Sequence, residues 1–88
     1  MALIYIGRLG KKKVFITLYS QKRLWQRNLT KYEVLHLLRK KDISYPVDED
    51  GRQKIRATLA SGKEAFLTVI EDTKRIIIIT GGESNAPS

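Results

Sequence analysis

The sequence contains no cysteine and only one histidine, His36. Without cysteine, a disulfide framework and a thiolate metal site are both excluded. A single imidazole cannot supply the histidine clusters that hold zinc and most other transition metals. We therefore expect a protein that uses neither a metal nor another cofactor.

Long apolar segments are also missing. The longest run, Ile76 to Ile79, has four residues, far fewer than the about 20 that a membrane-spanning helix needs. The first residues lack the basic region and the cleavage site of a secretory signal. These absences predict a cytoplasmic protein that does not engage a membrane.

Acidic residues are scarce in the first half of the chain. The 88 residues include 17 Lys/Arg and nine Asp/Glu, for a net charge of +8. Residues 1–41 hold eleven of the basic residues and one acid, Glu33, whereas residues 42–88 carry a net charge of −2. Such an asymmetry creates a positive potential that attracts phosphate backbones. RNA or another polyanion is the predicted partner, and the alternative is that the charge only confers solubility.

The length of the chain is sufficient for one domain. A domain of this size buries only about 60% of the surface that its unfolded chain exposes. We expect residues 1–81 to form a single basic α+β domain. Residues 82–88 show no hydrophobic periodicity and predict a flexible C-terminal tail.

Hydrophobic spacing predicts a hairpin followed by two helices. Residues 2–6 and 13–17 are β-branched and aromatic runs separated by two glycines, which is typical of a β-hairpin. From Leu18 the spacing becomes helical and continues to Asn28. Thr30 and Glu33 have the spacing of a capping box, which predicts a second helix over residues 31–40.

The remainder of the chain predicts strands at residues 43–47, 52–59, 65–70 and 75–80. In residues 52–59, apolar side chains alternate with Lys54, Arg56 and Thr58, so this strand has an apolar and a basic face. The run Ile76 to Ile79 is apolar on both faces, as in a central strand. The predicted fold is ββααββββ, with two helices packed on one face of a three- to four-stranded antiparallel sheet.

The first predicted helix carries a column of polar side chains. Tyr19, Arg23 and Arg27 are spaced four residues apart and therefore share one helix face. Facing the basic strand with Lys54 and Arg56, they could bind the phosphates of RNA. In the alternative interpretation, the arginines are solvated cations whose stems pack on the helix surface.

Further basic residues predict contacts with nucleic acid. Lys11, Lys12 and Lys13 lie together at the predicted hairpin tip, where they would either bind phosphate or protect an edge strand from aggregation. The other expected contacts are Lys22, Arg52, Lys54 and Lys63. Tyrosines at positions 5, 32 and 45 could stack on RNA bases, although no spacing requires it.

The segment TLYSQKRLWQRNLT, residues 17–30, resembles the opening of small domains related to the RelE/ParE toxin superfamily. Their pattern is a Thr, then His-Ala two residues later, two Arg four residues apart, and a helix cap. The likeness extends over about residues 13–81, through the acidic turn at Asp50-Gly51, the basic strand and the isoleucine run closed by Thr80. Tyr19 and Ser20 stand where that pattern has His and Ala.

The resemblance implies a RelE-like fold and a metal-independent endoribonuclease, in which a 2′-hydroxyl attacks the adjacent phosphate. Tyr19, Arg23, Arg27 and Arg56 are then the catalytic residues. Cations would stabilise the charge that develops on phosphorus, and one group would move a proton. An acidic antitoxin-type protein that masks the basic face is a further expected partner.

The tyrosine in place of histidine favours a second hypothesis. Here the chain is a non-catalytic nucleic-acid- or protein-binding module, a regulator or inhibitor from a phage, plasmid or mobile element. A third alternative gives the run Ile76 to Ile79 a structural role in a homodimer interface.

Overall fold

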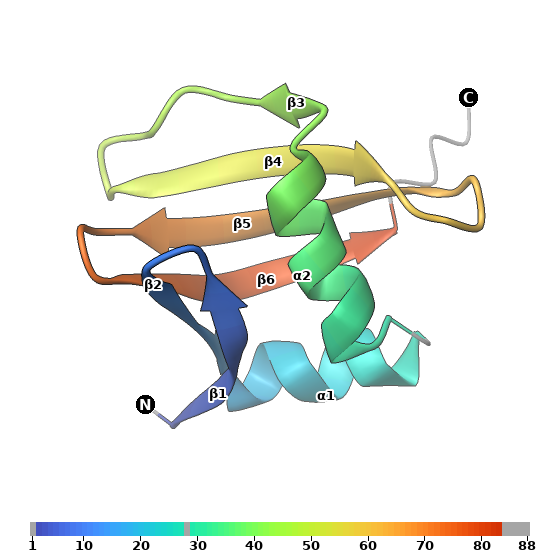
Figure 1. Ribbon diagram of the computed structural model, residues 1–88, viewed down its shortest axis with the longest axis horizontal. Helices are drawn as coiled ribbons and strands as arrows, with labels where there is room; N and C mark the ends of the chain where they lie inside the picture. The colour runs from blue at the N-terminus through green and yellow to red at the C-terminus, as the bar shows by residue number, and fades with distance from the viewer. Residues whose placement is uncertain (1, 28, 84–88) are drawn as a thin grey trace.

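The computed structural model describes residues 2–27 and 29–83 and contains six strands and two helices (Figure 1). In chain order the elements are β1 (Leu3–Leu9), β2 (Lys12–Thr17), α1 (Leu18–Gln26), α2 (Lys31–Lys40), β3 (Ile43–Ser44), β4 (Arg52–Thr58), β5 (Glu64–Glu71) and β6 (Arg75–Glu83). The α+β class and the element order ββααββββ agree with the prediction.

The predicted three- to four-stranded antiparallel sheet is wrong, because the described strands form one six-stranded mixed sheet. Its strand order is β1-β2-β6-β5-β4-β3. Neighbouring strands are antiparallel except β2 and β6, which pair in parallel with Val14 opposite Ile76 and Ile16 opposite Ile78. This pairing joins the N-terminal hairpin to the rest of the sheet. Alternation along a strand reports which face is buried and not which strand lies beside it, so the sequence did not predict the pairing.

The N-terminal hairpin is tighter than the sequence predicts. β1 continues to Leu9, so the connection to β2 is only Gly10-Lys11. The register shifts between Tyr5 and Gly7, where β1 has a bulge. Gly7 has φ +154°, and a Cβ atom there would lie 2.8 Å from Cδ1 of Leu35. The glycine therefore lets α2 approach the bulged strand closely.

Both helices begin with a side-chain cap. Thr17 caps α1, and its hydroxyl accepts a hydrogen bond from the backbone N–H of Ser20. The predicted capping box at α2 is confirmed, because Glu33 N–H donates to Thr30 Oγ1 while Thr30 N–H donates to the Glu33 carboxylate. The helix α1 ends at Gln26, and the expected break at Asn28 lies outside the described residues.

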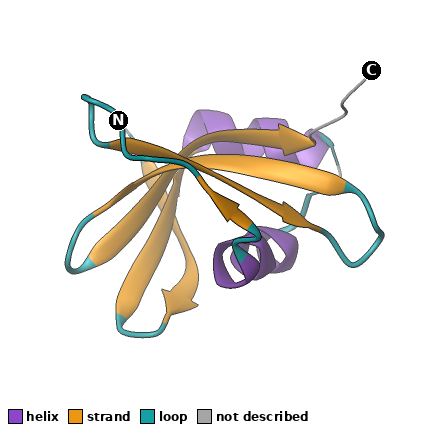
Figure 2. Ribbon diagram, turned by 90° about the horizontal axis from the view of Figure 1, so that it is seen from above, coloured by secondary structure: helices purple, strands orange, loops and turns teal. Residues whose placement is uncertain are grey.

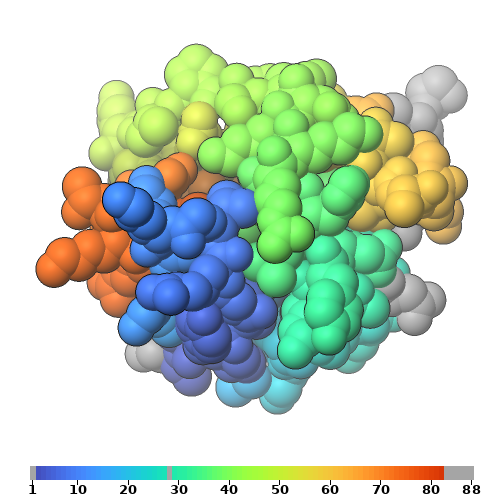
Figure 3. Space-filling model, in the orientation of Figure 1, coloured from blue at the N-terminus to red at the C-terminus, as the bar shows by residue number. Residues whose placement is uncertain are grey.

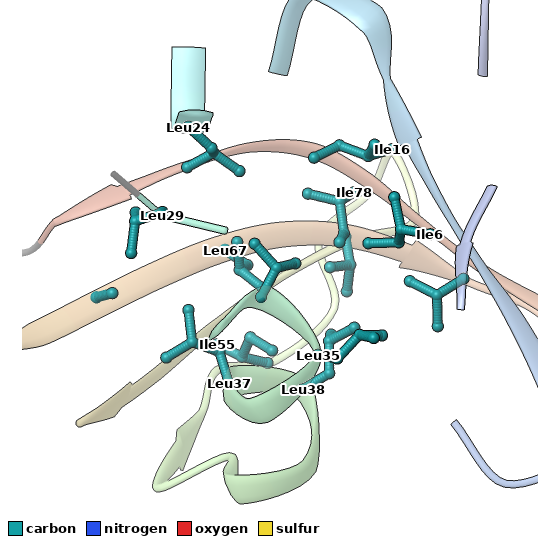
Figure 4. Close-up of a cluster of buried hydrophobic side chains, with 14 of the residues drawn as sticks. Ile6, Ile16, Leu24, Leu29, Leu35, Leu37, Leu38, Ile55, Leu67 and Ile78 are labelled. Atoms are coloured by element: carbon teal, nitrogen blue, oxygen red, sulfur yellow. The ribbon is translucent and has the colours of Figure 1, made fainter. Parts of the chain in front are cut away.

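α2 covers one face of the twisted sheet (Figures 1 and 2). In the space-filling view, α2, the hairpin and the segment after α2 cover this side of the molecule (Figure 3). The predicted apolar arc of α2 is confirmed, since Val34, Leu35, Leu37 and Leu38 are buried and His36 is exposed. In Figure 4, Leu35, Leu37 and Leu38 lie against the strands that carry Ile55, Leu67 and Ile78.

α1 lies along the edge of β6 rather than over the middle of the sheet (Figure 1). β2 pairs with β6 only as far as Ile78, and α1 runs beside the part of β6 that continues beyond it. The buried Ser20 hydroxyl donates a hydrogen bond to the carbonyl oxygen of Ile79. Leu24 is fully buried, and its Cδ2 lies 3.5 Å from where a Cβ atom of Gly81 would be. The side of α1 with Ser20 and Leu24 therefore faces β6, and the exposed Tyr19 and Arg23 lie on the neighbouring, polar side of the helix.

The C-terminal end of the sheet differs from the sequence prediction. β6 continues to Glu83, two residues into the segment expected to be a tail, and residues 84–88 lie outside the described part of the chain. Within residues 2–27 and 29–83, no helix combines the length and the apolar character needed to cross a membrane.

Candidate nucleic-acid interface

The sheet face opposite α2 is not covered by a helix in the described part of the chain, and we call it the open face. Alternate residues of β5 and β6 are buried towards α2, whereas the residues between them are partly exposed. Strand pairing places these partly exposed residues in rows across the sheet. The open face comprises Tyr5, Arg8, Lys13, Phe15, Tyr45, Lys54, Arg56, Phe66, Thr68, Ile70, Arg75, Ile77 and Thr80.

Phe66 forms the centre of an aromatic and cationic cluster on the open face. The Lys54 ammonium lies 4.8 Å from the centre of the Phe66 ring and 5.9 Å from the centre of the Tyr45 ring. The Tyr45 hydroxyl in turn accepts a hydrogen bond from Arg56 Nη1 at 3.4 Å. Cations over aromatic faces are attracted by the ring quadrupole, so β4 and the residue that follows β3 hold these groups next to β5.

Arg27 reaches the same cluster from α1. A Cβ atom at Gly82 would lie 3.2 Å from Arg27 Nη1 and 3.6 Å from Cε1 of Phe66. The guanidinium and the ring therefore flank one point of β6, and the absent side chain at residue 82 leaves room for both. Because Gly82 pairs with Phe66, and Phe66 with Arg56, one row of the sheet runs from Arg27 to Arg56.

The polar column on α1 extends this cationic surface. Arg23 Nη1 donates a hydrogen bond of 2.9 Å to the hydroxyl of Tyr19, which is 65% exposed. The contact shows that the predicted column exists at its first two positions. The surface around it forms a shallow hollow lined by Tyr19, Lys22, Arg23, Gln26 and Arg27.

Arg56 differs from the other predicted catalytic residues because it forms an ion pair with a described acidic side chain. Its Nη2 lies 2.9 Å from the Glu64 carboxylate. The hydrogen bond to Tyr45, together with the negative charge of Glu64, raises the pKa of the guanidinium above its ordinary value. Arg56 is thus a permanent cation that fixes Tyr45 beside Lys54.

A second aromatic and cationic cluster lies at the other end of the open face. The rings of Tyr5 and Phe15 meet edge to face, with centroids 5.7 Å apart and an interplanar angle of 65°. Together with Arg8 and Lys13 they line a shallow hollow. Arg75 pairs with Lys13 across β2 and β6, which adds a third cation to this end.

The predicted cluster of Lys11, Lys12 and Lys13 does not form one patch, because the pleat of β2 separates its members. Lys11 lies in the hairpin turn. Lys12 points to the α2 side, where it pairs with Glu71. Lys13 lies on the open face beside Arg8. Successive side chains of a strand point to opposite faces, so two lysines that are neighbours in the sequence lie on opposite faces of the sheet.

Two more of the predicted contacts lie near the rim of this surface. Arg52 begins β4 opposite Ile70, and its backbone N–H donates to the Asp48 carboxylate. Lys63 is exposed in the turn between β4 and β5. The structure thus brings Arg23, Arg27, Lys54 and Arg56 towards one surface and leaves Lys12 on the other side.

The sequence analysis missed Phe15, Phe66, Arg8 and Arg75 as members of this surface. Alternation was the available signal for Phe66, because Ala65, Leu67 and Val69 are buried on the opposite face of the same strand. For Arg8 the signal was hidden by the bulge at Gly7, which changes the alternation along β1.

This surface can bind phosphate groups through its Lys and Arg side chains, and its aromatic rings can stack on nucleic-acid bases. Arg23 and Arg27 can bind phosphate oxygens, and the Tyr19 hydroxyl is the group on the column that could move a proton. Among the described residues, no group of three or more His, Cys, Asp or Glu is placed to hold a metal ion. His36 lies on α2, away from the open face.

Comparison with protein-family models, with curated proteins and with solved structures found no match to this chain. The resemblance of residues 13–81 to RelE/ParE-type domains therefore stays a prediction.

Proposed function

We propose that this protein binds nucleic acid, specifically RNA, through the open face and the adjoining column of Tyr19, Arg23 and Arg27. The observation that carries the proposal is the arrangement around the partly exposed ring of Phe66. Lys54 of β4 lies over this ring, and Arg27, at the end of α1, lies beside the same point of β6. Phosphate contacts supply most of the sequence-independent affinity of such proteins, and aromatic rings accept bases.

The distribution of ion pairs supports the same surface. Glu71 pairs with Lys12 and Lys41 on the α2 side. Asp42 lies 3.7 Å from Lys40. Side chains on the open face and α1 that have no ion pair with any described acidic residue are Arg8, Lys13, Lys22, Arg23, Arg27 and Lys54. Arg56 and Arg75 of the open face pair with Glu64 and Asp72. The six other cations leave a positive charge beside the aromatic rings that no described acidic residue pairs with.

A cytoplasmic location belongs to the same proposal, because RNA and ribosomes are found there. An acidic antitoxin-type protein would bind the same cations and would compete with RNA. That competition makes such a partner an inhibitor of the proposed activity rather than an alternative to it.

The proposal is tested by the salt dependence of binding to a fluorescein-labelled single-stranded RNA. The variant Arg23→Ala/Arg27→Ala/Lys54→Ala should bind at least tenfold more weakly. Its plot of log affinity against log salt should be shallower by about two, since each lost contact to a single strand reduces the slope by about 0.7.

The matched control is Lys31→Ala/Arg39→Ala/Lys40→Ala, which removes three positive charges from α2. The control should bind nearly as well as wild type, because these side chains lie on the covered side of the sheet. Equal losses in the two triple variants would mean that only net charge matters, and the proposal would then fail.

A second candidate is the metal-independent endoribonuclease, and the hydrogen bond between Arg23 and Tyr19 favours it. A guanidinium beside a hydroxyl places a proton-moving group next to an anion stabiliser. The test is incubation with labelled RNA and with translating ribosomes in the absence of divalent metal. Cleavage that is lost in Tyr19→Phe and in Arg23→Ala would establish the enzyme. Intact RNA with salt-sensitive binding would leave the non-catalytic module.

A further inference from the structure

We infer that the ligand of the open face is a single-stranded nucleic acid whose unpaired bases stack on two separate aromatic sites, Tyr5 with Phe15 and Phe66 with Tyr45. This inference rests on the proposed function and adds the class of nucleic acid. It requires the surface to contact bases as well as phosphates, whereas binding by charge alone requires only contacts with phosphates.

The two aromatic sites lie on one face at a separation that a short strand of nucleic acid can cover. Phe15 is opposite Ile77, Ile77 is opposite Ile70, and Phe66 is four residues from Ile70 along β5. Two strand spacings of about 4.8 Å and four residues at about 3.3 Å place Phe15 and Phe66 about 16 Å apart. One oligonucleotide of a few residues can therefore contact both sites.

Between the two sites the surface is apolar or neutral. Ile70, Ile77, Thr68 and Thr80 occupy it and are partly exposed. Cations instead lie at the ends, with Arg8, Lys13 and Arg75 beside Tyr5 and Phe15. This arrangement suits a nucleic-acid strand whose flat bases lie on the apolar surface while its phosphates contact the cations.

Exposed aromatic rings are the part of this arrangement that fold stability does not explain. Tyr5 is 53% exposed and Tyr45 is 37% exposed. The hydrophobic core is made of aliphatic side chains, so these aromatic rings are not part of it. An exposed apolar surface with aromatic rings marks a binding site, and the cations at its two ends are complementary to a polyanion.

A base-paired duplex does not fit the same surface. Bases inside a duplex are stacked on each other, and the deep major groove of an RNA helix excludes side chains. Proteins that bind single strands instead combine a cationic path with stacking rings. The geometry therefore predicts preference for unpaired over paired nucleic acid.

The first experiment compares three fluorescein-labelled probes that carry equal numbers of phosphates. They are an oligoadenylate 12-mer, an abasic 12-mer with the same backbone, and a six-base-pair duplex, with a 5′-phosphate on every strand so that the phosphate counts match. The wild-type protein should bind the oligoadenylate at least about fivefold more tightly than the abasic probe, since one stacked base alone contributes about that factor. It should also bind the oligoadenylate more tightly than the duplex.

Leucine variants separate stacking from charge. Tyr5→Leu/Phe66→Leu keeps apolar side chains and all cations but removes two ring faces. Its affinity for the oligoadenylate should fall towards that for the abasic probe, with affinity for the abasic probe unchanged. Tyr32→Leu is the matched control, because Tyr32 is 72% exposed on α2 and lies away from the open face. If the double variant does not fold, Tyr5→Leu alone tests the first site, since its side chain is largely exposed.

The outcomes distinguish this inference from the proposed function. Equal binding of the base-containing and abasic probes, still weakened by Arg23→Ala/Arg27→Ala/Lys54→Ala, would overturn stacking and leave phosphate binding. Failure to bind any probe would overturn both. Concentration-dependent dimerisation that is lost in Tyr5→Leu/Phe66→Leu, with no probe bound, would assign the open face to a second copy of the chain and also overturn the inference.

A mapping experiment tests the position independently of affinity. Ultraviolet crosslinking of a 5-iodouridine 12-mer, followed by mass spectrometry, should modify peptides that contain Tyr5, Phe15, Tyr45 or Phe66. Crosslinks confined to α2 peptides would contradict the assignment.

Discussion

The buried hydroxyl of Ser20 donates a hydrogen bond to the carbonyl oxygen of Ile79, and this contact joins α1 to β6. The register between β5 and β6 shifts at this point, so the Ile79 carbonyl lies outside the regular ladder. The Ser20 oxygen also accepts a hydrogen bond of 2.7 Å from Thr17 Oγ1. The N-cap of α1 and the edge of β6 are thus linked through one serine, which fixes the direction in which Tyr19 and Arg23 face.

Ser20→Ala should lower the free energy of unfolding by about 1–2 kcal/mol, because a part-buried carbonyl loses its partner. Urea denaturation measures the change. Ser61→Ala, in the exposed turn between β4 and β5, should stay within about 0.5 kcal/mol of wild type. Equal midpoints for the two variants would show that the Ser20 contact contributes nothing to stability.

Two adjacent glycines of β6 should respond differently to alanine. A Cβ atom at Gly81 would lie 2.6 Å from Leu67 Cδ2 and 2.8 Å from the Phe66 carbonyl oxygen. Because a backbone atom cannot move aside cheaply, Gly81→Ala should destabilise the fold by about 1–3 kcal/mol.

The Cβ atom added by Gly82→Ala would come closer than ordinary van der Waals distance to one side chain, Arg27, whose Nη1 would lie 3.2 Å away. That atom is the far end of a flexible side chain. The thermal midpoint of the variant should therefore stay close to that of wild type, while its affinity for RNA falls as the Arg27 guanidinium is displaced from its position beside residue 82. A comparison of thermal melts with binding curves checks the pair. The prediction is wrong if Gly82→Ala is as unstable as Gly81→Ala.

The two neighbouring lysines of β2 offer a charge-matched test of the open face. Lys13→Ala should weaken RNA binding and make the salt dependence shallower by about 0.7, the value for one lost contact to a single strand. Lys12→Ala removes the same charge but acts on the α2 side, where Lys12 pairs with Glu71, and should leave affinity nearly unchanged. Fluorescence anisotropy at several salt concentrations measures both. Similar losses for the two variants would contradict the division of the lysines between two faces.

The turn between β5 and β6 should make a pH-dependent contribution to stability. The Asp72 carboxylate accepts hydrogen bonds of 2.8 Å from the N–H groups of Lys74 and Arg75, and these bonds lower its pKa below the ordinary value. Its stabilising effect is therefore complete above the usual aspartate pKa of about 3.9 and is lost as the pH falls through the lowered value.

Asp72→Asn keeps an acceptor oxygen but cannot titrate. The stability advantage of wild type over this variant should be constant near neutral pH and should shrink as the pH falls from about 4 towards about 2, as measured by urea midpoints. A difference that stays constant over that range would mean that Asp72 does not titrate with folding. Asp50→Asn is the control, because Asp50 lies in another exposed turn.

Local features of this protein were predictable because neighbouring residues decide them. Thr30 and Glu33 specify the start of α2 through atoms three residues apart, and the structure contains both hydrogen bonds. The alternation around Ile55 likewise separates the basic and apolar faces of β4, as the structure has them. Tyr19 and Arg23 meet because a helix places residues four apart side by side.

Features that depend on distant residues were not predictable in this way. The parallel pairing of β2 with β6 joins residues about 60 positions apart, and no local pattern encodes it. The same pairing converts the predicted small sheet into six strands and brings Phe15 onto the face that carries Phe66. This pairing also determines which side chains of β2 face α2, and it therefore places Lys12 and Lys13 on opposite faces of the sheet.

The sequence by itself determined the class of elements, their order, the basic character of the chain and the apolar arc of α2, because each follows from spacing within a few residues. Only the tertiary structure decided which of the cations share a surface. Arg27 directly follows α1, Lys54 belongs to β4 and Phe66 to β5. They lie near one another because Gly82 leaves space at the end of β6 and because α1 is fastened to its edge. Such a meeting depends on packing between remote segments, which alternation and charge along the chain do not specify.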